Sequence, residues 1–204
     1  MNDSIRCKMH AGVLLAALSC VPTASWAAFA YDESVDGDLS GDGLNPTVLD
    51  AGVGVNTLTG SISPDDLDYL TFNIAAGLQL DAIMLVSFST DDVGFIGVMN
   101  GATFTEPPSD PDVANLLGWV HFGPDLVGTD ILDDMGLGDG AIGFTPPLPS
   151  GDYSFWIQQL NNDTDYELQF VVSAVPLPAA LPLLGWGLLG LGGYARLRPR
   201  GGKA

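Results

Sequence analysis

The sequence predicts an all-β protein: one antiparallel β-sandwich that lies between two end segments directed to membranes. Short stretches of alternating apolar and polar residues recur between clusters of Gly, Pro, Asn and Asp, which is the pattern of a sandwich domain. All six basic residues lie in the two end segments, and every acidic residue except Asp3 lies between them. We therefore expect three parts: residues 1–30, an acidic domain over 31–173, and residues 174–204.

Residues 1–30 have the layout of a secretory signal peptide. Arg6 and Lys8 form a basic start, and the apolar run over 11–20 is too short to cross a bilayer as a helix. Small residues then offer cleavage after Ala27 or after Ala30. The alternative is a buried N-terminal helix. Cleavage also removes both cysteines, so we expect no disulfide in the mature domain.

Strands are expected where the acidic domain shows period-two alternation or a short continuous apolar run. They cover residues 56–62, 70–74, 80–88, 93–99, 153–157 and 166–172. Only residues 112–117, which follow Pro111, look helical. The Gly-, Pro- and Asp-rich stretch over 101–149 predicts long connections with few strands. A domain of this length is expected to bury one hydrophobic core.

The C-terminal segment has the features of a membrane span. Residues 175–194 form an uncharged stretch of about twenty residues, which is long enough for one transmembrane segment. Four basic residues follow it: Arg196, Arg198, Arg200 and Lys203. By the positive-inside rule this end stays in the cytoplasm, so the acidic domain faces outward. The simplest alternative is an ordinary tail anchor.

The start of that stretch carries a recognisable motif. Its residues are Val175, Pro176, Leu177, Pro178 and Ala179. Together with the Gly- and Leu-rich span and the terminal arginines, the motif resembles the PEP-CTERM sorting signal in its VPLPA form. The resemblance implies a Gram-negative bacterial protein that is exported through the inner membrane and handled by an exosortase, a membrane peptidase-transpeptidase. It also implies a destination at the cell surface or in the extracellular matrix, where such proteins accompany exopolysaccharide.

Several pieces of the acidic domain resemble the pre-peptidase C-terminal type of β-sandwich. The matching segments are 60–62, 66–72, 76–77 and 149–155. The resemblance spans roughly residues 55–173 and implies a single jelly-roll-like antiparallel β-sandwich. In that family such modules accompany catalytic domains, whereas here we expect the module to stand alone.

The residue content of the domain restricts its chemistry. Its acidic excess repels nucleic acid and anionic lipid and attracts cations. Nucleophilic catalysis lacks its usual residues, because His121 is the domain's one histidine and no Gly-x-Ser-x-Gly elbow is present. We expect a structural histidine and a protein that is not an enzyme. The alternatives are a hydrolase that acts on exopolysaccharide through a carboxylate pair, and a plain tail-anchored periplasmic protein.

One acidic loop matches the opening of a calcium-binding loop, because oxygen ligands alternate along it and a glycine stands at the sixth position. The candidate ligands are Asp36, Asp38, Ser40 and Asp42. Thr47 replaces the expected bidentate glutamate, so other acidic residues would have to complete the shell. The available ones are Asp32, Glu33 and Asp50. The alternative is a solvated acidic loop.

Two tryptophans are the remaining candidates for ligand binding. Trp156 lies on the face of its predicted strand opposite Phe155, and Trp119 lies near His121. An outward tryptophan either stacks on a sugar ring or packs beneath a neighbouring loop, and we expect the second arrangement. Taken together, the residues predict a non-enzymatic surface or matrix protein that binds polysaccharide, cations or itself.

Overall fold

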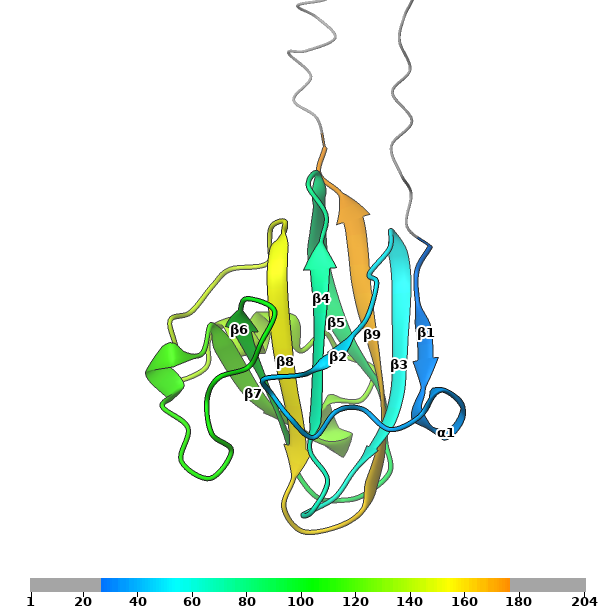
Figure 1. Cartoon of the computed structure of the whole chain (residues 1–204), viewed down its shortest axis with the longest axis vertical. Helices are drawn as coiled ribbons and strands as arrows, with labels where there is room; N and C mark the ends of the chain where they lie inside the picture. The colour runs from blue at the N-terminus through cyan, green and yellow to red at the C-terminus, as the bar shows by residue number, and fades with distance from the viewer. Residues whose placement is uncertain (1–26, 177–204) are drawn as a thin grey trace, which may run out of the picture.

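The computed structural model describes residues 27–176 and contains two β-sheets packed face to face (Figure 1). Sheet A has, in spatial order, β1 (Ala30–Asp32), β3 (Gly54–Ile62), β9 (Thr164–Ala174) and β5 (Leu78–Phe88). Sheet B has, in spatial order, β2 (Thr47–Val48), β4 (Asp68–Ile74), β8 (Gly151–Gln159), β6 (Gly94–Asn100) and β7 (Gly118–Phe122). The predicted all-β sandwich is therefore confirmed.

The six strands predicted from the sequence are all present, as β3, β4, β5, β6, β8 and β9, with ends within about two residues of the prediction. β1 and β2 escaped prediction because three residues and two residues are too few to show an alternating pattern. Both short strands pair in parallel, β1 with β3 and β2 with β4. The prediction of a wholly antiparallel sandwich was wrong at these two pairs.

The helical segments of the described residues are short: α1 (Glu33–Asp36), the 3-10 turn η1 (Val113–Asn115), the 3-10 turn η2 (Pro124–Leu126) and α2 (Leu132–Gly136). η1 confirms the helical turn predicted over 112–117, whereas the other three are too short to show helical periodicity in the sequence. No helix within residues 27–176 has the length and apolar character needed to cross a membrane. The predicted transmembrane segment lies almost wholly beyond residue 176, outside the described residues, as does most of the signal peptide.

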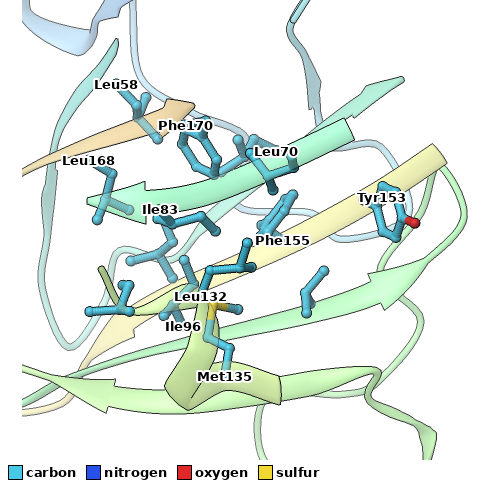
Figure 2. Close-up of a cluster of buried hydrophobic side chains, with 14 of the residues drawn as sticks. Leu58, Leu70, Ile83, Ile96, Leu132, Met135, Tyr153, Phe155, Leu168 and Phe170 are labelled. Carbon is cyan, nitrogen blue, oxygen red and sulfur yellow. The ribbon is translucent and has the colours of Figure 1, made fainter. Parts of the chain in front are cut away.

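The main hydrophobic core lies between the inner faces of the two sheets. Phe72, Phe155 and Phe170 pack against one another there, with ring centroids 5.2–5.4 Å apart. α2 adds Leu132 and Met135, which point into the same core (Figure 2). Burial of each such side chain is worth about 1.5–3 kcal/mol, so this core fixes where the strands begin and end.

Residues 27–49, which we name the N-terminal arm, cover one edge of the sandwich. The arm starts on sheet A as β1, passes through α1, and reaches sheet B as β2 (Figure 1). Leu39 in its middle is buried, and the backbone N–H of Tyr69 donates to the carbonyl of Ser40 (2.8 Å). The arm thereby closes the edge of the core at the point where β4 begins.

Candidate metal centre

Asp68 places a carboxyl group inside the core. It is the first residue of β4, and alternation puts it on the same inner face as Leu70 and Phe72. Its side chain is completely buried. Oδ2 accepts a hydrogen bond from the hydroxyl of Tyr166 (2.6 Å), whereas Oδ1 has no partner among the described residues. A buried polar atom without a partner destabilises the fold, so we expect this oxygen to bind a ligand or to carry a proton.

Burial dominates the acidity of this group. Loss of solvent raises the pKa of Asp68 to about 8, although the Tyr166 hydroxyl opposes the shift by donating to the carboxylate. The charge of Glu33 raises the pKa of Asp68 further. Burial likewise raises the pKa of Tyr166, and the neighbouring Asp68 adds to that shift. Without a cation, Asp68 is therefore mostly protonated at pH 7.

Two carboxyl groups of the N-terminal arm lie beside Asp68. Glu33 and Asp38 each bring one oxygen to the group, and these oxygens and one of Asp68 all lie within 4.8 Å of one another. We name these three residues the acidic cluster. Glu33 is half-buried and Asp38 is exposed, so the cluster is open to solvent on the Asp38 side.

Backbone groups hold Glu33 in place. The N–H of Leu39 donates to its Oε1 (2.9 Å), and the N–H of Ser61 donates to its Oε2 (2.6 Å). Each carboxylate oxygen has two lone pairs, so both remain able to bind a cation. Burial raises the pKa of Glu33, and it also raises that of the neighbouring Asp66, to which the charge of Asp38 contributes.

Gly60 makes room for the cluster. It lies on β3 directly opposite Tyr166 on β9. A Cβ atom at this position would lie 2.7 Å from the Tyr166 hydroxyl oxygen and 2.9 Å from Glu33 Oε2. Only glycine therefore lets the tyrosine and the glutamate approach at this point.

The acidic cluster fits a calcium ion. Calcium binds oxygen ligands at 2.3–2.6 Å, so two oxygens on one ion lie at most about 5 Å apart, in agreement with the 4.8 Å limit of the cluster. Three carboxylates can supply three to six of the six to eight oxygens that calcium takes, with water for the others. Residues 27–176 contain no lysine or arginine, so no described residue brings an ammonium or guanidinium group to the cluster.

The predicted calcium loop contributes one residue to this cluster, Asp38. Asp36 instead accepts from the backbone N–H of Asp32 (2.9 Å), and Asp42 accepts from the N–H of Leu44 (2.9 Å). The Ser40 hydroxyl accepts from the N–H of Asp42 (3.1 Å). These three residues thus shape the turns of the arm, and the candidate ligands do not converge as one loop.

Sequence reasoning missed Asp68, although it named Glu33 as a residue that might complete a calcium shell. The available signal was an acidic residue in phase with the inward-facing Leu70, Phe72 and Ile74. An acidic residue on the buried face of a strand is unusual and points to a partner that compensates its charge.

The predicted aromatic candidates lie elsewhere, on the outer face of sheet B. Trp156 is almost fully buried beneath a loop that contains Phe104, which confirms the expectation of a covered tryptophan. The indole N–H of Trp119 donates to the carbonyl of Asp139 (3.1 Å). His121, expected to be a structural histidine, is exposed beside the Trp119 ring (centroids 5.2 Å apart).

The processing residues lie at the two ends of the described region. Ala27 precedes the sandwich and Ala30 is the first residue of β1. Of the sorting motif, Val175 and Pro176 follow β9, and Leu177, Pro178 and Ala179 lie outside the described residues. The N–H of Val175, the first residue of the motif, donates to the carbonyl of Gly77 (2.8 Å).

No protein-family model matches the chain, and a search of curated proteins finds no match. Among solved structures, the chain is similar to the crystal structure of Aeromonas hydrophila PliG, a periplasmic lysozyme inhibitor of g-type lysozyme. The two share 17% sequence identity with a TM-score of 0.36, over 62% of this chain and 96% of that chain.

Proposed function

We propose that this chain is an exported, non-enzymatic β-sandwich protein of the bacterial cell surface or extracellular matrix that binds calcium at the acidic cluster. One observation carries the calcium assignment: Asp68 is fully buried with one oxygen unpartnered, and its carboxyl group lies in one cluster with the carboxylates of Glu33 and Asp38. Of the ligand classes that the sequence suggests, namely polysaccharide, cations and the protein itself, this geometry best supports a cation.

Calcium at the acidic cluster would join the N-terminal arm to the sandwich. Glu33 and Asp38 belong to the arm, whereas Asp68 begins β4. A shared ion therefore links two segments that are distant in sequence and fixes the edge that the arm covers. Extracellular calcium modules bind with dissociation constants of about 0.1–1 mM, and a site with one exposed ligand suits that class.

The burial of Asp68 argues against the alternative of an exopolysaccharide hydrolase at this cluster. The paired carboxylates of a glycosidase must flank a glycosidic bond, so both must be reachable by substrate. Asp68 has no exposed surface, and a polysaccharide cannot reach it. Metal binding needs only one open side, which Asp38 supplies.

The two predicted end signals favour export and C-terminal sorting. The strands of the described residues run from β1 at Ala30 to β9 at Ala174, so they include only the last residue of the first signal and the first residue of the second. β1 starts and β9 finishes at the same end of the sandwich (Figure 1). Under this proposal an exosortase-type membrane transpeptidase recognises Val175–Ala179, and the membrane span is a sorting device. A plain tail anchor predicts instead that the span is retained.

The contacts of Phe29 favour signal cleavage after Ala27 rather than after Ala30. The Phe29 ring packs against Phe72 and Phe170, with centroids 6.5 and 6.3 Å away. Its backbone N–H donates to Asn56 Oδ1 (3.1 Å). Cleavage after Ala30 would remove these contacts and the first residue of β1.

Strand order supports the jelly-roll-like form of the sandwich. The orders β3–β9–β5 and β4–β8–β6–β7 match interlocked Greek keys, one strand short of the eight-stranded jelly roll. Isolated bridges take the place of a further strand along β5. They join Leu80 to Leu148 and Met84 to Asp130.

Equilibrium dialysis against radioactive calcium tests the proposed site, with protein purified from cells that produce the full chain. We expect one calcium per chain, and we expect Asp38→Asn and Glu33→Gln to weaken binding at least tenfold. Loss of one carboxylate removes a charged ligand from a shell that has three.

Asp36→Asn and Asp42→Asn are the matched controls, because both change acids of the same arm that lie outside the cluster. We expect calcium affinity close to that of the unaltered protein in both. If these controls weaken binding as much as Asp38→Asn does, the ion sits in the loop rather than at the cluster. Absence of calcium binding at millimolar concentration would remove the proposal.

A further inference from the structure

A row of side chains on the outer face of sheet B lies apart from the acidic cluster. In the strand register Gln158 of β8 is opposite Phe95 of β6, and Phe95 is opposite His121 of β7. These three side chains therefore lie side by side across neighbouring strands. His121 on β7 is the residue of this row farthest from the calcium site, because β8 and β6 lie between β7 and β4 in the sheet.

The ring of Phe95 is fixed by its neighbours. It leans over Gly97, where a Cβ atom would lie 3.1 Å from the ring. Its centroid is 4.8 Å from that of Trp156 and 5.9 Å from that of His121. Because its neighbours already fix this ring on two sides, binding of a ligand would cost no further conformational entropy at Phe95.

A cavity of about 160 Å³ lies at this row, and amide side chains line much of it. Gln159 is fully buried there, and its Nε2 makes no hydrogen bond of normal geometry with the described residues, although its side chain lies close to the Asp92 carboxylate. The side chains of Gln158 and His121 make no hydrogen bond to another residue of 27–176. Asp92, also on the lining, accepts from Asn161 Nδ2 (3.2 Å).

We infer that this cavity binds one sugar ring of a neutral polysaccharide. Amide groups offer donors and acceptors side by side, which is what vicinal hydroxyls require. Phe95 and His121 supply aromatic surface for the apolar face of the ring. The cavity is smaller than the roughly 300–1,000 Å³ of drug-sized sites, so it suits a single ring.

Charge selects among sugars. Asp92 lies on the cavity wall, and residues 27–176 contain no lysine or arginine that would attract a carboxylate or sulfate. Uronic acids and sulfated sugars are therefore excluded by repulsion. The inference concerns a different face from the calcium site and does not depend on calcium binding.

Affinity electrophoresis tests this inference, with protein purified from cells that produce the full chain. Native gels containing laminarin, dextran or galactomannan serve as neutral probes, and gels containing alginate serve as the anionic one. We expect retardation by at least one neutral polymer and none by alginate. We expect Gln158→Ala and His121→Ala each to weaken that binding about tenfold, as loss of one hydrogen bond or one aromatic contact would do.

Gln169→Ala is the matched control, because this half-buried glutamine lies on β9 in the other sheet. It should bind like the unaltered protein, and all three variants should melt at the unaltered temperature. The inference is overturned if no neutral polymer retards the protein, or if alginate retards it equally. It is also overturned if Gln158→Ala and His121→Ala bind as well as Gln169→Ala does.

Discussion

Replacement of Asp68 by asparagine separates two effects of this carboxyl group: the free-energy cost of burying it in the fold, and its contribution to calcium binding. The asparagine would keep the shape of the side chain and still accept from the Tyr166 hydroxyl, but it would bring no negative charge to the cluster with Glu33 and Asp38. The variant should therefore gain stability without calcium and lose its response to calcium. Few substitutions of a buried polar residue are expected to stabilise a protein, so the sign of the effect is informative.

The magnitude follows from the pKa of Asp68. One pKa unit corresponds to 1.36 kcal/mol, and the carboxyl group has a pKa of about 8 in the fold against 3.8 for the free group. At pH 7 the fold must keep protonated a group that is ionised in the unfolded chain, at a cost of about 4 kcal/mol. At pH 5 the same cost is about 2 kcal/mol. Asp68→Asn removes this cost.

Urea unfolding in excess chelator measures this gain. We expect Asp68→Asn to exceed the unaltered protein by about 4 kcal/mol at pH 7 and by about 2 kcal/mol at pH 5, with an unchanged m-value. Added calcium should stabilise the unaltered protein and leave the variant unchanged. A variant that is less stable than the unaltered protein in chelator, or one that still responds to calcium, would show that this prediction is wrong.

Three further predictions follow from the same contacts. In chelator, the contribution of Asp68 to the stability of the protein should be greatest below about pH 4, where Asp68 is protonated both in the fold and in the unfolded chain. This stability is lost as the pH rises through about 8, because the folded pKa of Asp68 lies above its unfolded value. Urea midpoints should therefore fall over that range, and a flat profile would contradict this prediction. Gly60→Ala should lower the free energy of unfolding by about 1–3 kcal/mol and weaken calcium binding in dialysis, because its Cβ would collide with the Tyr166 hydroxyl. Gly41→Ala should do neither, because the nearest contact of a Cβ there is at 3.8 Å. Intact-mass measurement of the exported protein should find a start at residue 28 and a loss of the terminal arginines; a start at residue 31 would contradict the packing of Phe29.

The sandwich could be predicted because several of its long strands alternate in sequence between apolar residues and more polar ones. Alternation marks such strands in the sequence, and β4, β8 and β9 were located by it. β1 and β2 were missed because pairing with a neighbouring strand, and not their own composition, makes these short segments strands. Trp156 could be expected to be covered, but Phe104, which covers it, lies in a segment without periodicity.

The acidic cluster could be predicted only in part, because its members are far apart in the sequence. Glu33 and Asp38 lie on the same acidic arm, so spacing alone could suggest them as ligands. Asp68 joins them only because the arm folds over the edge at which β4 begins. Spacing rules for calcium loops assume that all ligands come from one segment, and here the ligands come from two.

Calorimetric melting of the purified protein in calcium and in chelator is the simplest test of calcium binding at the acidic cluster. A ligand that binds only the folded state at one hundred times its dissociation constant adds about 2.7 kcal/mol. For a domain of this size that corresponds to a rise of about 5–10 °C in the melting midpoint. We expect such a rise in the unaltered protein and in Asp36→Asn, and at most about half of it in Asp38→Asn, whose binding is at least tenfold weaker. Equal midpoints in calcium and in chelator for the unaltered protein would contradict the assignment of calcium to this site.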